Sequence, residues 1–281
     1  MMFDSFLGRT AVITGSASGI GLALARHAIS LGMNVVMVDL DQAALDEASG
    51  QLAGSGRVLA CKADVSMEDD LLAVRQAAIE RFGPIHLLFN NAGVLLAKST
   101  WSYTTADWAW ILGVNLGGVT NGTRAFLPHM REHGQGAWIV NTASVAGFIS
   151  PAGLAAYNAS KQAVVAVSET LQAELKQSGE RIGVSVLCPA WVATQIGNSE
   201  RIRPGRYAPD HLELSKHDKE AQDEREKSIS TAISKGKITA EDIAMLTFSA
   251  IARKQFYIFP HPRIFPSIEE RFETIRSACM T

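Results

Sequence analysis

The sequence predicts one α/β domain, a doubly wound parallel sheet of seven strands flanked by helices. Seven short runs of β-branched and other apolar residues recur along the chain, nearly unbroken by polar residues, as in strands covered on both faces. Segments with helical periodicity separate these runs, which is typical of successive βαβ units. The length of 281 residues, with 47% hydrophobic and 19% charged residues, fits a single globular domain of this class.

The elements follow from these patterns in chain order. We expect strands over residues 9–14, 34–40, 57–63, 85–91, 137–143, 182–188 and 255–259. We expect helices over residues 20–31, 42–52, 68–82, 106–130 and 155–176. The composition changes once, at residues 213–227, where ten of fifteen residues are charged. This charged stretch belongs to an insertion at about 196–237 and is typical of a solvated helix face.

Composition and charge exclude several classes of function. The net charge is −2, which offers no electrostatic footprint for nucleic acid or for anionic membranes. No apolar run approaches the ~18 residues that a membrane span needs, and the N-terminal residues lack the basic region of a signal peptide. Cys61, Cys188 and Cys279 are odd in number and far apart. We therefore expect free thiols in the cytoplasm rather than a disulfide framework.

A glycine-rich loop, Thr-Gly-Ser-Ala-Ser-Gly-Ile-Gly at residues 14–21, joins the first expected strand to the first expected helix. Glycines there let the backbone approach a pyrophosphate, whose charge is bound by free N–H groups at the helix N-terminus. The position between a strand and a helix is the context that such a motif requires. We expect a nucleotide cofactor to contact Gly15, Ser18, Gly19, Ile20 and Gly21.

Asp39 stands at the end of the second expected strand, eighteen residues after Gly21. A carboxylate at this place accepts hydrogen bonds from a ribose 2′-hydroxyl and repels a 2′-phosphate. No Lys or Arg lies in the glycine-rich loop, and Leu40 follows the aspartate. The sequence therefore favours NAD over NADP.

Tyr157 and Lys161 are four residues apart in an expected helix, so they share one helix face. A nearby cation favours the phenolate and lowers the pKa of a tyrosine toward the range useful for acid–base chemistry. The pair alone is not specific. Ser144, however, follows the expected strand 137–143, at the sheet edge where ligands bind in open α/β folds. Its hydroxyl could polarise a carbonyl or hold an alcohol.

Taken in order, these residues resemble the short-chain dehydrogenase/reductase (SDR) family. The match runs through residues 14–21, Asp39, Asp64 with Val65, Asn-Asn-Ala-Gly at 90–93, Asn115, Ser144, Tyr157 with Lys161, and Pro-Ala-Trp-Val-Ala-Thr at 189–194. Ala190 departs from the family's usual glycine, and His86 from its frequent aspartate, but neither is a catalytic position. The resemblance implies a Rossmann fold, NAD as cofactor, an alcohol or ketone substrate, and a homo-oligomer, either a dimer or a tetramer.

The resemblance also implies a role for each catalytic residue. Tyr157 would be the general acid/base that exchanges a proton with the substrate oxygen, and Ser144 would hydrogen-bond that oxygen. Lys161 would lower the pKa of Tyr157 and bind the nicotinamide ribose. Asn115 would hold a water molecule that links Lys161 to solvent.

Further cofactor contacts are implied at Asp64, Val65, Asn91, Ala92, Gly93, Pro189, Val192 and Thr194. Of these, Asp64 and Val65 would flank the adenine, and Val192 with Thr194 would fix the carboxamide. By the same analogy the substrate would lie among Leu95, Val145, Phe148, Leu154, Trp191 and Ile196. All six are apolar, so we expect a neutral, bulky, alicyclic or aromatic secondary alcohol or its ketone. Residues 107–130 and 256–272 show a looser resemblance to the bacterial branch that includes Cα-dehydrogenases of lignin-type aryl ethers.

The insertion at about 196–237 lies where the family has its variable, substrate-covering segment. We expect a lid there, with Ile196, Ile202, Leu212 or Leu214 turned inward. Two other functions compete with the leading one. One is an NADPH-dependent ketoreductase, which Asp39 disfavours, and the other is a non-catalytic NAD(H)-sensing or scaffold protein, which the presence of Tyr157 and Lys161 disfavours.

His129 and His133 lie four residues apart, a spacing that could present two imidazoles to a metal ion. They fall at the end of an expected helix, where positive charge is favourable. The sequence offers no third ligand nearby, so we expect no metal site.

Overall fold

The structure is a computed structural model that describes residues 5–208 and 215–279. Seven strands form one parallel sheet in the order β3-β2-β1-β4-β5-β6-β7. They are β1 (Thr10–Thr14), β2 (Asn34–Asp39), β3 (Val58–Lys62), β4 (Leu87–Asn90), β5 (Ala137–Thr142), β6 (Ile182–Leu187) and β7 (Tyr257–Ile258). The predicted seven-stranded, doubly wound Rossmann-type sheet is confirmed.

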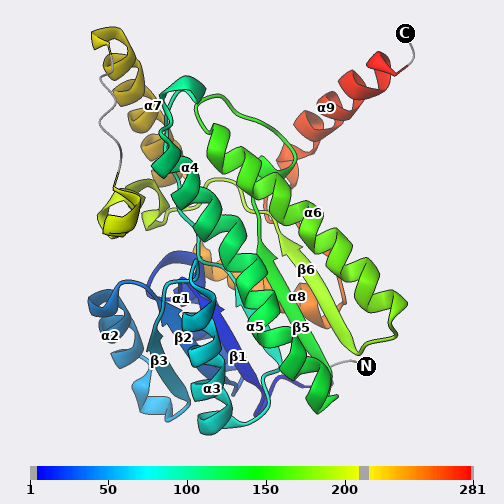
Figure 1. Ribbon diagram of the computed structural model, residues 1–281. Coiled ribbons are helices and arrows are strands. Elements are labelled where there is room, and N and C mark those ends of the chain that lie inside the picture. Colours follow the sequence, from blue (N-terminus) through cyan, green and yellow to red (C-terminus); the bar gives the residue numbers. More distant parts are fainter. Residues whose placement is uncertain (1–4, 209–214, 280–281) are drawn as a thin grey trace.

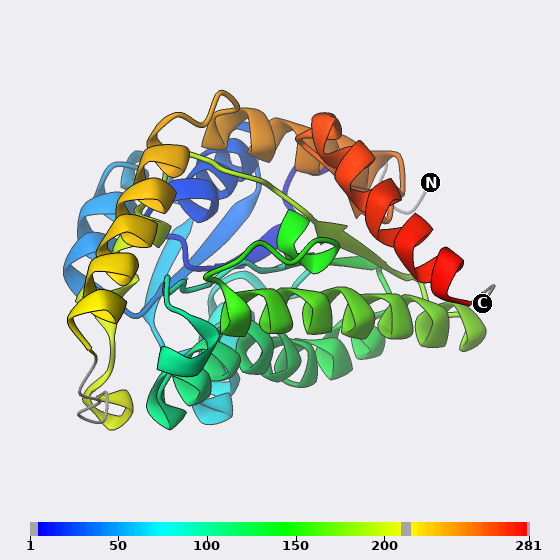
Figure 2. The same ribbon diagram turned by 90° about the horizontal axis from the view of Figure 1, so that it is seen from above.

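Helices cover both faces of the sheet (Figures 1 and 2). One face packs against α1 (Gly19–Ser30), α2 (Gln42–Gly50) and α8 (Ala240–Ala252). The other packs against α3 (Glu68–Phe82), α5 (Gly118–His133) and α6 (Ala155–Gln177). Alternate residues of a strand point to opposite faces, so Ile13 joins the first core and its neighbour Val12 the second. Burial on both faces explains why the strands read as unbroken apolar runs.

The helix expected over residues 106–130 is interrupted. It consists of α4 (Thr105–Leu112), a π-helical segment at Gly113–Gly117 and α5. Two contacts explain why glycine occupies this region: a Cβ at Gly113 would lie 2.9 Å from the Tyr207 hydroxyl, and a Cβ at Gly118 would lie 2.8 Å from Val65 Cγ2. Short π segments of this kind often mark functional sites, and this one carries Asn115.

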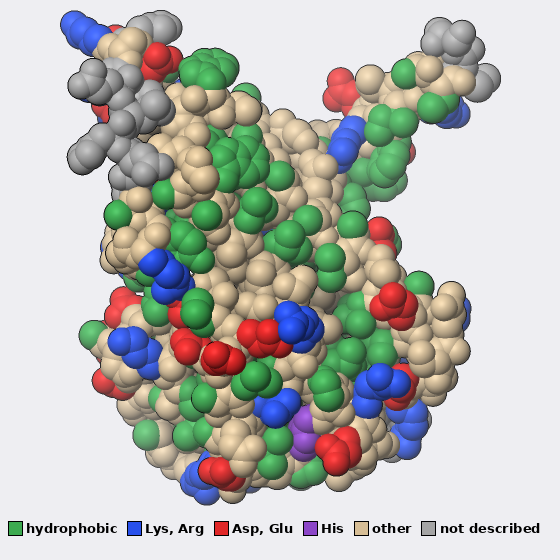
Figure 3. All heavy atoms as spheres, in the orientation of Figure 1, with side chains coloured by type: hydrophobic (Ala, Val, Ile, Leu, Met, Phe, Trp, Pro, Cys, Tyr) green, Lys and Arg blue, Asp and Glu red, His purple; other side chains and the backbone are tan. Residues whose placement is uncertain are grey.

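The chain reverses its direction of winding between β1 and β4, which are neighbours in the sheet although β2 and β3 separate them in sequence. In open α/β sheets ligands bind at the carboxyl ends of the strands beside such a reversal. α7 (Lys216–Ser234) lies over this end of the sheet, and α9 (Phe265–Ala278) projects from the body with hydrophobic side chains on its surface (Figures 1 and 3). Among the helices of residues 5–208 and 215–279, none has the length and apolar character to cross a bilayer.

Candidate active site

Tight packing fixes the loop between β1 and α1. Gly15 has a φ of +64° and Gly19 a φ of +52°, a conformation that side chains other than glycine rarely adopt. A Cβ at Gly15 would lie 2.8 Å from the Cα of Ala92, and one at Gly19 would lie 2.9 Å from Thr194 Cγ2. Both glycines are therefore required by the backbone of the loop and by the residues that face it.

The loop is also tied to the end of β4. Thr14 Oγ1 accepts hydrogen bonds from the backbone N–H groups of Asn91 (2.9 Å) and Ala92 (3.0 Å). The Asn91 side chain donates to the carbonyl of Thr14 at 2.9 Å. Gly21 lies behind the loop, where an added Cβ would be only 2.0 Å from the Gly15 carbonyl oxygen. Its role is to let α1 start directly beneath the loop, and it does not itself face the cavity.

The N-terminus of α1 suits an anion. Within the described residues, the side chain of the N-cap residue Ser18 makes no capping hydrogen bond, and the first turn of α1 holds no acidic residue. The positive end of the helix dipole and the first N–H groups of the helix thus remain available for a negatively charged group. Gly15, Ser18, Gly19 and Ile20 line one cavity at this point. These features fit the pyrophosphate of a dinucleotide.

Asp39 ends β2 and faces the same cavity. Its Oδ2 accepts a hydrogen bond from the N–H of Ala17 in the glycine-rich loop at 3.0 Å, and its Oδ1 accepts one from the N–H of Asp41 at 3.1 Å. The carboxylate is thereby held beside the loop while partly exposed. It retains lone pairs that could accept bonds from ribose hydroxyls.

Asp64 and Val65 line the cavity beyond Asp39. Asp64 Oδ1 accepts hydrogen bonds from the backbone N–H of Ser66 (2.9 Å) and from its hydroxyl (2.7 Å). Asp64 Oδ2 pairs with the guanidinium of Arg206, a residue 142 positions away.

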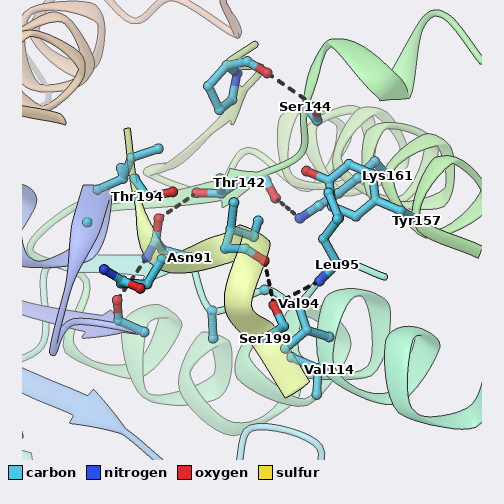
Figure 4. A pocket seen from close by; sticks show the side chains of 18 of the residues that line it. Asn91, Val94, Leu95, Val114, Thr142, Ser144, Tyr157, Lys161, Thr194 and Ser199 are labelled. Carbon is cyan, nitrogen blue, oxygen red and sulfur yellow. Dashed lines mark hydrogen bonds between the residues drawn. The ribbon is translucent and has the colours of Figure 1, made fainter. Parts of the chain in front are cut away.

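Three of the four predicted catalytic side chains meet at the carboxyl end of β5 (Figure 4). Ser144 follows that strand, and its hydroxyl donates to the carbonyl of Pro189 at 3.2 Å. Tyr157 and Lys161 come from the first turns of α6. Lys161 Nζ donates to the carbonyl of Thr142 at 2.8 Å. The helix and the strand end together place a hydroxyl, a phenol and an ammonium group around one space.

Burial dominates the titration of this pair. It raises the pKa of the Tyr157 phenol to about 12, although interaction with the Ser144 hydroxyl lowers it. Burial also lowers the pKa of the Lys161 ammonium to about 8. The sequence predicted that Lys161 lowers the pKa of Tyr157, and in the chain alone this pKa is raised instead, because burial disfavours the charged phenolate. The phenol of Tyr157 is therefore neutral at pH 7.

Asn115 is completely buried behind the cavity, in the π-helical segment. Its Oδ1 accepts from the Val94 N–H at 2.8 Å, while its Nδ2 donates to the Val94 carbonyl and to Ser160 Oγ, each at 3.0 Å. These bonds fix the amide rigidly. The predicted role of Asn115 in a proton relay remains a prediction.

Most of the other predicted contacts also line the cavity. They are the cofactor candidates Asn91, Ala92, Gly93, Pro189, Val192 and Thr194, and the substrate candidates Leu95, Val145, Leu154, Trp191 and Ile196. Phe148 requires a correction, because it is not among the lining residues. Its ring packs instead against Tyr257 and Phe259, with ring centroids 5.9 and 5.2 Å away. The short helical turn Val145–Gly147 rotates the chain between Val145 and Phe148, so the two side chains face different ways.

Several lining residues escaped the sequence analysis. Trp110 of α4 and Val114 of the π-helical segment both line the cavity. Ile233 of α7 lines it too and is only 6% exposed. The sequence could have indicated Ile233, because Ile229 and Ile233 lie four residues apart in an otherwise strongly polar helix. That spacing places two apolar side chains on one helix face, which is typical of a buried face.

Part of the segment expected to form a lid lines the cavity, and its role as a lid remains a prediction. Ile196 and Ile202 line the cavity, as predicted, whereas Leu212 and Leu214 lie outside the described residues. Ser199 Oγ accepts a hydrogen bond from the Leu95 N–H at 3.1 Å, which joins this segment to the wall of the cavity (Figure 4).

His129 and His133 both bond to the backbone of Ile85. His129 Nε2 accepts from the Ile85 N–H at 3.3 Å, and His133 Nε2 lies 2.9 Å from the Ile85 carbonyl oxygen. These contacts connect the end of α5 to the residues just before β4. They give His129 and His133 a structural role.

The whole chain has clear relatives. Residues 9–204 match the family described as short chain dehydrogenase. A CLA biosynthesis dehydrogenase/reductase of Lactiplantibacillus plantarum is 34% identical over 271 residues, which are 96% of this chain and 94% of the relative.

Solved structures agree with the sequence matches. A short chain dehydrogenase/reductase from Burkholderia phymatum in complex with NAD is 42% identical, has a TM-score of 0.93 and covers 98% of this chain and 97% of its own. The apo form of LigO from Sphingobium sp. strain SYK-6 is 27% identical, has a TM-score of 0.77 and covers 99% of this chain and 91% of its own. These similarities extend along the chain well beyond the motifs that first indicated them.

Proposed function

Because the chain belongs to the short chain dehydrogenase family, we propose that it is an NAD-dependent oxidoreductase that interconverts a secondary alcohol and its ketone. The observation that carries this proposal is the convergence of Ser144, Tyr157 and Lys161 on one cavity that also holds the glycine-rich loop and Asp39. A bound nicotinamide would donate or accept the hydride. The side chains of the protein would place the substrate oxygen and exchange its proton.

Each catalytic side chain has a task that its surroundings support. Tyr157, a neutral phenol, would protonate the oxygen of a ketone as it is reduced and would accept the proton in the reverse direction. Ser144 would turn its hydroxyl from the Pro189 carbonyl to the substrate oxygen. Lys161, held by Thr142, would place positive charge beside the phenol and favour the phenolate that remains after proton transfer.

Asp39 supports NAD as the cofactor. Its carboxylate is fixed by two backbone N–H groups at the place where it would meet the adenosine ribose. A 2′-phosphate there would face a negative charge at short range. An NADPH-dependent ketoreductase is the second candidate and would require this repulsion to be overcome.

The walls of the cavity support a neutral, bulky and apolar substrate, alicyclic or aromatic. Leu95, Leu154, Trp191 and Ile196 give the space around Tyr157 an apolar character. Of the arginines in residues 196–207, Arg203 and Arg206 are paired with carboxylates, and Arg201, which lines the cavity, donates to the Asn198 carbonyl at 2.9 Å. The proposed lid over this space comprises residues at about 196–237.

We also propose a homo-oligomer, a dimer or a tetramer, located in the cytoplasm. Large apolar side chains are exposed on α8 and α9, namely Met245, Leu246, Phe265, Phe272 and Ile275, and apolar surface of this kind often marks an interface. All three cysteines are free, which suits a reducing compartment. Sedimentation equilibrium tests the assembly, and a purely monomeric protein would contradict it.

The test of the proposed function has two steps. NADH and NADPH are first titrated into the protein and followed by fluorescence. The oxidised form of the tighter cofactor is then supplied with secondary alcohols graded from small aliphatic compounds to 1-phenylethanol, bicyclic alcohols and steroids. The proposal expects tighter NADH binding and turnover that rises with the apolar bulk of the alcohol. Preference for NADPH would favour the ketoreductase, and NADH binding without turnover across the panel would favour a sensor or scaffold.

A further inference from the structure

Two arginines in the segment of residues 195–207 pair with aspartates in distant parts of the chain. We call this segment the strap, because it follows Thr194, which lines the cavity, and its last residues contact Asp64, which lines the same cavity. Arg203 pairs with Asp107 of α4, and Arg206 pairs with Asp64 after β3. The two pairs differ sharply in burial, which determines how the strap can move.

The Arg203 pair is an anchor. Arg203 Nη2 lies 2.7 Å from Asp107 Oδ1, and their side chains are 5% and 0% exposed. The guanidinium also lies 4.9 Å from the centroid of the Trp110 ring, and Lys98 Nζ lies 2.7 Å from the second carboxylate oxygen of Asp107. Opening such a pair would leave buried charges without partners. The strap is therefore fixed at Arg203.

The ion pair of Arg206 is more exposed to solvent than that of Arg203. The Arg206 side chain is 43% exposed, and it bonds Asp64 together with Ser66 Oγ, which lies 2.8 Å from its Nη2. The Asp64 side chain is 9% exposed, but its Oδ1 keeps the two hydrogen bonds from Ser66 when Arg206 leaves, and the guanidinium can be hydrated where it stands. This pair therefore costs less to open than the fully buried Arg203 pair. Tyr207 beside it reaches Ser66 with its hydroxyl at 3.4 Å. The end of the strap thus rests on residues 64–66 through contacts that water can replace.

Asp64 and Val65 line the cavity next to Asp39 and the glycine-rich loop. If the cofactor is a dinucleotide, as the proposed function states, its adenosine half occupies this end of the cavity. We infer that Arg206 is a positioning residue for that half. By pairing with Asp64 it holds the strap across the adenosine, and the dinucleotide leaves only when the pair opens.

The experiment compares Arg206→Ala with wild type by the dissociation rate of NADH, measured by stopped-flow fluorescence. The expected result is about a fivefold faster dissociation, the upper range for a half-exposed ion pair. Arg206→Lys, which keeps the charge, should restore a slower rate. Arg131→Ala serves as a matched control, because Arg131 is 54% exposed, pairs with Glu180 at 2.7 Å, and neither residue lines the cavity.

A second ligand separates positioning from a general structural effect. Reduced nicotinamide mononucleotide lacks the adenosine half, so Arg206→Ala should leave its dissociation constant unchanged. Equal weakening of both ligands, or a change below twofold in the NADH rate, would overturn the inference while leaving the proposed function intact. If wild type binds neither NADH nor NADPH, the proposed function fails and this inference fails with it.

Discussion

The ammonium of Lys161 lies 5.6 Å from the centroid of the Tyr157 ring, one helical turn farther along α6. Both side chains are buried, and the ammonium is oriented by its bond to the Thr142 carbonyl at the end of β5. The positive charge is thus fixed beside the phenol before any ligand binds. It needs no reorganisation to stabilise the phenolate when a proton leaves, which is how preorganised charge assists catalysis.

The glycine-rich loop allows a direct test of the cofactor site. Gly21→Ala would place a Cβ 2.0 Å from the Gly15 carbonyl oxygen, so the loop must move. We expect NADH affinity to fall by at least about tenfold, or ~1.4 kcal/mol. Gly50→Ala is the matched control, because a Cβ there meets nothing within 4 Å, and isothermal titration should show unchanged affinity. Unchanged affinity in Gly21→Ala as well would argue against the loop as the pyrophosphate site.

Asp39 should control the choice between NADH and NADPH. Asp39→Asn removes the negative charge and keeps an acceptor oxygen, so the ratio of NADPH to NADH affinity should rise by about tenfold. Asp41→Asn is the control, because Asp41 caps α2 by accepting from the Ala44 N–H and asparagine caps equally well. Fluorescence titration of both cofactors measures the ratio. A ratio that moves equally in both variants would assign the effect to general charge rather than to Asp39.

The pH dependence of kcat/KM for NADH should follow the ionisation of Lys161. Burial sets the pKa of Lys161 at about 8, so the side chain carries its charge below that pH and loses it above. We expect kcat/KM for NADH to fall as the pH rises beyond about 8, because this parameter reports groups of the free enzyme. The fall should be absent from the low residual activity of Lys161→Met. A wild-type profile that stays flat to pH 10 would contradict this assignment.

The anchor of the strap should contribute to stability. Burial raises the pKa of Asp107, but its bonds to Lys98, Thr104 and Arg203 outweigh burial and hold the pKa below its ordinary value. Asp107→Asn would leave the cations without their carboxylate and should lower the free energy of unfolding by about 3 kcal/mol. Urea denaturation measures the loss. Asp223→Asn makes the same change at an exposed site of α7 and should have little effect.

Local spacing explains which parts of this molecule the sequence could predict. The glycine-rich loop and the Tyr157–Lys161 pair each lie within one turn or one loop, so their geometry follows from backbone rules alone. The unbroken apolar runs likewise predicted a sheet covered on both faces. The boundaries of the elements followed from the same patterns, usually within two residues.

Other features depend on contacts between distant segments and could not be predicted. The π-helical segment lies where Tyr207 packs closely against Gly113, and Val65 packs against the following Gly118. The pairing of Arg206 with Asp64 joins residues 142 positions apart. Phe148 was misplaced because a single short turn decides which way its ring faces. The pKa of Tyr157 was misjudged because burial cannot be read from the spacing of two residues.

The central claim is that Tyr157 transfers the proton while the rest of the site binds the cofactor. Tyr157→Phe removes only the hydroxyl, so we expect NADH affinity close to that of wild type and turnover lower by at least about a hundredfold, the usual contribution of general acid–base catalysis. Tyr257→Phe, which removes the hydroxyl of a tyrosine outside the cavity, is the matched control and should turn over normally. Measuring NADH affinity and turnover of the best alcohol side by side in the three proteins decides the matter. Turnover of Tyr157→Phe within tenfold of wild type would contradict the proposed mechanism.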